Sequence, residues 1–156
     1  FWLIEQLDYW EDAYIMMQKE VADRLNAKVN TKAYGRLTVV VGAYLDIDLC
    51  FSIKPDVFIP KPKVDSAIVR FTKKVCPLIK DDQYMRFNKI VSAAFSQRRK
   101  MLRNSLRGLV GEDMDESLSC WEEISGIDFD RRPEQLEIEE FVCLGNVLYS
   151  LREKQK

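Results

Sequence analysis

Phe58, beside two spaced prolines, is the first place in this sequence where residue type and spacing suggest chemistry. Pro60 and Pro62 follow it and lead into the β-branched run Val64–Phe71. Proline fixes φ and biases the preceding residue toward extended backbone, so the loop can hold Phe58 rigidly at the edge of a sheet. An exposed aromatic held there can stack on a flat ligand. The alternative is that Phe58 is a core side chain beneath a proline turn.

A second segment combines cations with neutral hydrogen-bond donors. Its cations and amides are Gln97, Arg98, Arg99, Lys100, Arg103, Asn104 and Arg107. Arg99, Arg103 and Arg107 are spaced by four residues, which on a helix places them in one stripe. Because arginine binds phosphate bidentately and can stack on bases, the stripe indicates nucleic-acid contact. A merely solvated basic surface is the alternative.

Several kinds of chemistry are excluded by composition. The 156 residues contain no histidine, and four cysteines lie far apart with no Cys-x-x-Cys pair. This argues against a zinc site and against catalytic pairs of serine or cysteine with histidine, and it fits buried thiols in a reducing cytoplasm. No apolar run approaches the length of a membrane span, and the first residues given lack the basic region, apolar core and small-residue cleavage site expected of a signal peptide.

The net charge of −1 hides an asymmetry between two parts of the chain. Residues 54–107 contain fourteen lysines and arginines against four acids, a local balance of +10, whereas residues 111–156 have a balance of −8. The split suggests one side that faces nucleic acid and a far side that is solvated.

The elements that must position these residues form two groups. Residues 1–9 resemble the last turns of an amphipathic helix, and 13–18 predict a buried strand followed by a helical turn over 19–25. Residues 35–45 favour a helix, with a strand as the competing interpretation because of Val39, Val40 and Val41. Strands are expected over 49–53 and 64–73. After Pro77 the periodicity is helical, with helices predicted over 101–109 and 117–124 and at the C-terminal end.

Five ordered motifs resemble the KsgA family of small-subunit ribosomal RNA adenine dimethyltransferases. They are Met17–Leu25, Tyr34–Leu37, Phe58–Ala67, Phe95–Lys100 and Arg132–Leu136. The similarity covers nearly the whole chain but only the C-terminal half of a family member. It implies α/β plus all-α architecture: about three strands from the C-terminal part of a Rossmann-like class I methyltransferase sheet (residues 1–75), then a small helical rRNA-binding domain (76–156).

The resemblance also implies an activity for the parent enzyme. Family members use S-adenosylmethionine to dimethylate N6 of two adjacent adenines in the 3′-terminal hairpin of small-subunit rRNA, during ribosome assembly on the pre-30S particle in the cytoplasm. It places Phe58 beside the target adenine and Lys61 and Lys63 near rRNA phosphate, while Asp65 and Ser66 could instead fix the turn. Gln18, at the carboxyl end of a strand, either contributes to the site or caps the next helix.

The family's Asn-Leu-Pro-Tyr catalytic motif and glycine-rich cofactor loop have no counterpart in this sequence, which contains no Gly-x-Gly. We therefore expect no catalytic, cofactor-binding or metal-binding residue in this chain, and an inactive fragment when it is alone. A stand-alone RNA-binding or ribosome-assembly module is one alternative, and a mitochondrial transcription factor of the same fold is another. In the family's sheet order the strand at 13–18 would have an unpaired edge, which predicts self-association.

Overall fold

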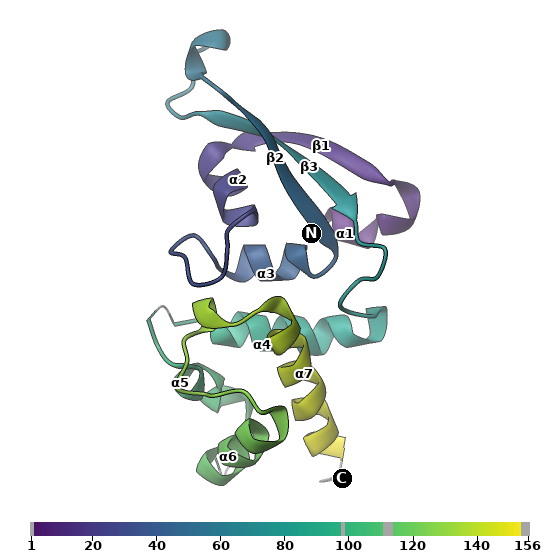
Figure 1. Cartoon of the computed structure of the whole chain (residues 1–156), viewed down its shortest axis with the longest axis vertical. Helices are drawn as coiled ribbons and strands as arrows, with labels where there is room; N and C mark the ends of the chain where they lie inside the picture. The colour runs from purple at the N-terminus through teal and green to yellow at the C-terminus, as the bar shows by residue number, and fades with distance from the viewer. Residues whose placement is uncertain (1, 98, 111–113, 154–156) are drawn as a thin grey trace. The chain divides into compact units, whose positions relative to one another are not determined.

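A computed structural model describes residues 2–97, 99–110 and 114–153, and it divides the chain into two compact units, residues 1–77 and 78–156 (Figure 1). In chain order the first unit contains α1 (Trp2–Glu5), the 3₁₀ turn η1 (Leu7–Tyr9), β1 (Asp12–Gln18), α2 (Lys19–Leu25), α3 (Arg36–Gly42), β2 (Leu45–Ile53), the 3₁₀ turn η2 (Pro55–Val57) and β3 (Ser66–Lys73).

The three strands of the first unit form one antiparallel sheet in the order β1-β3-β2. The registers bring Gln18, Ser66 and Ile53 into one row at one end of the sheet. The β2–β3 pairing is interrupted between Leu49 and Phe51, where the register shifts by one residue. Such a bulge bends and twists a strand locally.

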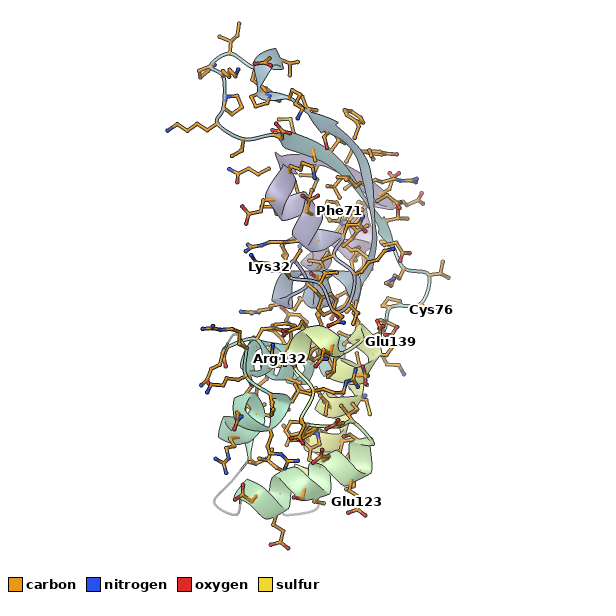
Figure 2. The ribbon with its side chains drawn as sticks, turned by 60° about the vertical axis from the view of Figure 1, so that its left-hand side comes forward. Lys32, Phe71, Cys76, Glu123, Arg132 and Glu139 are labelled. Atoms are coloured by element: carbon orange, nitrogen blue, oxygen red, sulfur yellow. The ribbon has the colours of Figure 1, made fainter. Side chains whose placement is uncertain are left out.

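Helices cover one face of this sheet. α2 packs against all three strands and α3 packs against β2. The shared core contains Val39 and Val40 from α3 and Val69 and Phe71 from β3, all buried. Phe71 lies among the side chains between sheet and helices (Figure 2). Alternation along β3 therefore points one set of side chains into the helix-covered core, as the period of two requires.

The helix predicted from residues 35–45 is confirmed over Arg36–Gly42, despite its three consecutive valines. The buried hydroxyl of Thr38 accepts a hydrogen bond from the Gly35 N–H at 3.2 Å and donates one to the Arg24 carbonyl at 2.6 Å. These bonds satisfy the start of α3 and link it to the end of α2. The chain then enters β2 at Leu45, four residues earlier than the predicted strand.

The strand predicted at 13–18 is present, but its predicted burial is wrong. Tyr14 and Met16 of β1 are 61% and 52% exposed, and none of the seven residues of the strand is fully buried. β1 is an edge strand, and the helices of the first unit pack on one face of the sheet. The opposite face also exposes Phe51 of β2. An apolar run indicates a strand without indicating how many of its faces are covered.

The second unit is helical. It contains the 3₁₀ turn η3 (Asp81–Gln83), α4 (Tyr84–Ala94), α5 (Leu102–Leu106), the 3₁₀ turn η4 (Arg107–Leu109), α6 (Met114–Ser125), the 3₁₀ turn η5 (Pro133–Gln135) and α7 (Ile138–Glu153). α7 packs against both α4 and α6. Buried side chains from these helices include Phe87, Trp121, Phe141 and Leu144. The predicted helix over 117–124 extends to Ser125 and ends at Gly126, whose φ of +68° is readily adopted by glycine at a helix end.

None of the described helices is both long and apolar enough to cross a membrane.

Candidate nucleic-acid interface

The loop between β2 and β3 is held by its own polar contacts. Phe58 follows η2, and its N–H donates to the Pro55 carbonyl at 3.2 Å. The ammonium of Lys54 donates to the Asp65 carboxylate at 2.8 Å across the base of the loop. This hydrogen bond, together with the attraction between the two charges, raises the pKa of Lys54 above its ordinary value. The loop is therefore closed at its base as well as stiffened by its prolines.

Asp65 also connects the loop to the helix layer. Its backbone carbonyl accepts a hydrogen bond from the Lys19 N–H at 2.9 Å, at the first residue of α2. Since Lys19 directly follows Gln18, this bond brings the end of the loop to the end of β1. Asp65 thus fixes the turn, which is one of the two roles that the sequence left open for it.

Gln18 occupies the capping position before α2, but its side chain forms no capping hydrogen bond and is exposed. The interpretation that Gln18 caps this helix is therefore wrong. Its place beside Ser66 in the sheet register puts it at the end of the sheet from which the loop extends. An exposed amide there is available to a ligand.

Phe58 is partly exposed and does not belong to the buried core. Lys61 forms an ion pair with Asp56 inside the loop. Lys63 is exposed and forms no ion pair with any residue of the described part of the chain. The loop therefore exposes one aromatic side chain in part and two lysines, and one of the lysines, Lys61, is already paired with a carboxylate.

The basic segment of the second unit does not form the continuous helical stripe that its spacing predicts. Arg99 precedes α5 and has a φ of +71°, while α5 itself covers only Leu102–Leu106. The Leu102 N–H donates to the Arg131 carbonyl at 2.9 Å, and the Arg103 N–H donates to the Phe129 carbonyl at 2.9 Å. Because a distant loop satisfies the first donors of α5, the helix starts there and Arg99 lies outside it.

Two of the predicted RNA-binding arginines are engaged by acids of the same unit. Arg103 donates to Glu122 at 2.6 Å and to Asp130 at 3.4 Å, and these contacts, led by the hydrogen bond to Glu122, raise its pKa. Arg107 pairs with Asp115 at 2.7 Å. The acids of residues 111–156 therefore neutralise part of the basic segment instead of forming a separate far side. Sequence reasoning missed these pairs because each joins separate elements.

The remaining predicted contacts are more accessible. Arg99, Lys100 and Asn104 are exposed, and neither Arg99 nor Lys100 forms an ion pair with a described residue. Arg98 lies outside the described residues. Arg99 and Lys100, the exposed cations without a described partner, therefore lie in the loop before α5 and do not form part of a helical stripe.

The sequence contains no Gly-x-Gly pair of the kind found in the cofactor loops of dinucleotide-binding folds. Cofactor loops of this fold class need closely spaced glycines between a strand and a helix. The glycine that begins α3, Gly35, has extended backbone and open space where a side chain would be, so no close approach requires it.

The sequence matches the family model of the ribosomal RNA adenine dimethylases over residues 1–149. The chain belongs to this family. The resemblance that its motifs indicated is thereby confirmed.

Two relatives show how much of a family member the chain covers. The ribosomal RNA small subunit methyltransferase A of Staphylococcus carnosus is 42% identical over 140 residues, which make up 88% of this chain and 47% of the relative. The protein of the same name from Nitrosospira multiformis is 42% identical over 153 residues, 97% of this chain and 56% of the relative. The chain therefore spans about half the length of the curated relatives it matches.

Solved structures support the fold. A dimethyladenosine transferase from Plasmodium falciparum aligns with a TM-score of 0.73 at 23% identity, covering 97% of this chain and 62% of that chain. The 23S rRNA methyltransferase ErmE aligns with a TM-score of 0.58 at 23% identity, covering 89% of this chain and 55% of that chain. The small three-stranded sheet with helices thus has counterparts in methyltransferase structures.

Proposed function

We propose that this chain supplies the RNA-facing part of an S-adenosylmethionine-dependent rRNA adenine N6,N6-dimethyltransferase. The proposed substrate is a pair of adjacent adenines in the 3′-terminal hairpin of small-subunit rRNA, within the pre-30S particle in the cytoplasm. The observation that carries the proposal is the loop around Phe58, which is closed at the end of the sheet in a chain of the rRNA adenine dimethylase family.

The two units would have different roles. Residues 1–75 are proposed to be the C-terminal portion of the methyltransferase domain, and 76–156 the rRNA-binding domain. Phe58 would stack on the adenine ring, and the exposed amide of Gln18 would donate or accept hydrogen bonds near it. Lys61 and Lys63 would contact phosphates next to the target, while Arg99, Lys100 and Asn104 hold RNA at the helical unit.

The isolated chain is expected to lack methyltransferase activity. An adenine amine needs a cofactor methyl within bonding reach, and the sequence contains no Gly-x-Gly loop to hold that cofactor. We propose that the isolated chain binds the rRNA hairpin but neither binds S-adenosylmethionine nor methylates adenine.

Phe58→Ala tests the base-stacking role. Stacking of a base on an aromatic side chain contributes about 1–3 kcal/mol, so Phe58→Ala should weaken binding of the hairpin roughly 5- to 150-fold. Fluorescence anisotropy of a labelled hairpin would measure this. Phe58→Leu is the matched control, because leucine keeps the apolar bulk and removes the π face.

The two variants separate stacking from packing. If Phe58 stacks on RNA, both variants lose affinity while the leucine variant keeps the thermal stability of the wild type. Wild-type affinity in Phe58→Leu, with loss of stability in Phe58→Ala, would show that Phe58 is a packing residue and would sink its assignment to the adenine site.

Self-association through β1 is a further part of the proposal. Asp12–Gln18 pairs with β3 in unbroken register and contains no proline or lysine, two residues that often protect a sheet edge, whereas β2 has a bulge. We expect sedimentation velocity to show a mass that rises with concentration, and Met16→Lys to reduce it. A monomer at every concentration would refute this pairing.

A further inference from the structure

Three aliphatic side chains are exposed on the loop that carries Phe58. Val57 is 69% exposed, Ile59 is 101% exposed and Val64 is 47% exposed. Figure 1 shows that the connection from β2 to β3 projects beyond α2 and α3, and Figure 2 shows its side chains reaching outward. Single exposed aliphatics are normal on a protein surface, but three within eight residues of a projecting loop form a local apolar tip.

The loop has the contacts needed to hold this tip in place. The Lys54–Asp65 bond of 2.8 Å closes its base, the Phe58 N–H bond of 3.2 Å closes η2, and the Lys61–Asp56 pair joins its two sides. A segment ordered before binding loses little conformational freedom when it inserts into a ligand. The exposed aliphatics therefore belong to a preformed projection.

The charges around the tip favour an anionic partner. The loop from Lys54 to Asp65 contains three lysines, Lys54, Lys61 and Lys63, against Asp56 and Asp65, which leaves a local charge of +1. All three lysines are exposed. Lysines beside an apolar point are the arrangement by which architectural proteins contact phosphates while an aliphatic side chain enters a base step.

Other partners fit this tip less well. Three aliphatic side chains offer far less area than the roughly 800 Å² per partner of a stable protein interface. Binding to a lipid surface typically uses a broad apolar helix face with tryptophan, phenylalanine or leucine, and this loop has none of that breadth. RNA is the partner whose chemistry matches a narrow apolar point flanked by cations.

We propose that Ile59, supported by Val57, is a wedge that enters the base stack of the rRNA hairpin beside the adenine placed on Phe58. This proposal rests on the proposed function and adds to it the means of opening the stack. An adenine can present its exocyclic amine only after leaving its neighbours, at a cost in stacking energy. An aliphatic side chain in the vacated space offsets that cost, and Lys61 and Lys63 hold the phosphates on either side of the opened step.

The test uses the wild-type chain and an rRNA hairpin that carries 2-aminopurine next to the two adjacent target adenines. The fluorescence of 2-aminopurine rises when the base is unstacked. At saturating protein we expect wild type to raise the fluorescence several-fold and Ile59→Ser to give less than half of that rise. Val75→Ser is the control, because Val75 is also a β-branched aliphatic residue, 99% exposed, but lies outside the loop. It should behave as wild type.

Fluorescence measured at saturating protein reports unstacking independently of affinity. Hairpin binding itself distinguishes failure of the wedge from failure of the proposed function. Tight hairpin binding with no rise in fluorescence, or an equal rise with Ile59→Ser, would overturn the wedge and leave the proposed function standing. Absence of hairpin binding by the wild-type chain would overturn both. Binding to anionic phosphatidylserine vesicles that Ile59→Ser abolishes, with no effect of that change on the hairpin signal, would assign the tip to a lipid surface instead.

Discussion

Replacing Trp121 by alanine is expected to lower the free energy of unfolding of the helical unit by about 3–5 kcal/mol. Trp121 is fully buried, and its ring meets Phe129 edge-on at a centroid distance of 5.4 Å. Its Nε1–H donates to the Leu144 carbonyl of α7 at 3.1 Å. Truncation would leave a cavity, remove an aromatic pair and leave that carbonyl without this donor. A loss of this size is a large part of the stability of a small domain.

Hydrogen exchange of the amides of α4 and α7 would measure this loss within the helical unit, independently of the sheet unit. Ile124→Ala is the surface control on the same helix, since Ile124 is 55% exposed, and it should change protection little. Trp121→Phe, which keeps a buried ring without the donor, should fall between wild type and alanine. Protection in Trp121→Ala within about 1 kcal/mol of wild type would contradict the packing described for α6.

Local patterns in the sequence were sufficient for most elements of the fold. A short apolar run located β1, and alternating or apolar runs located β3 and the second half of β2, while apolar spacing favoured a helix for residues 35–45 over a strand. These signals succeed because the period of buried residues is set by the element itself. The burial of β1 was predicted wrongly because burial depends on what covers each face of a sheet, and that information is not in the strand.

The basic segment shows a second limit of sequence reasoning. The spacing of Arg99, Arg103 and Arg107 is correct for a helix, yet α5 starts at Leu102 because carbonyls from Phe129 and Arg131 satisfy its first N–H groups. Likewise, the acids that engage Arg103 and Arg107 lie 8 to 27 residues further along the chain. Tertiary contacts of this kind decide which cations remain accessible, and no local count of charges reveals them.

The loop around Phe58 could be predicted in outline. The prolines indicated a stiff loop on a sheet, and the family motifs singled out the loop as a site. The sequence could not show that Lys61 pairs with Asp56, or that Asp65 joins the loop to α2. Both contacts shape the surface that we propose faces RNA.

Reversing the charges of the two accessible cations before α5 should strongly weaken RNA binding. Arg99→Glu with Lys100→Glu changes exposed side chains that form no ion pair with described residues, so the fold should be retained. We expect hairpin affinity to fall about 10- to 100-fold near 0.1 M salt, because two phosphate contacts become repulsions. Arg103→Glu is a poorer variant for this test, since it would place a third acid beside Glu122 and Asp130.

A matched control is available in the loop between α2 and α3. Lys28→Glu with Lys32→Glu makes the same change in net charge at two exposed lysines outside the predicted interface. If the effect of the first pair were a matter of overall charge, both double variants would lose affinity equally. We expect the control to remain within about 3-fold of wild type, since salt screens exposed charges that make no direct contact with the RNA.

The most direct test of RNA binding at the loop before α5 is the salt dependence of hairpin affinity for wild type and these two double variants. We predict that the logarithm of the association constant falls linearly with the logarithm of salt concentration for wild type and for Lys28→Glu with Lys32→Glu. For Arg99→Glu with Lys100→Glu the slope should be shallower by roughly 1 to 2, because each phosphate contact that is lost removes about one counterion from those released on binding. A slope unchanged by that substitution, or a wild-type chain whose affinity for the hairpin is independent of salt, would contradict the account.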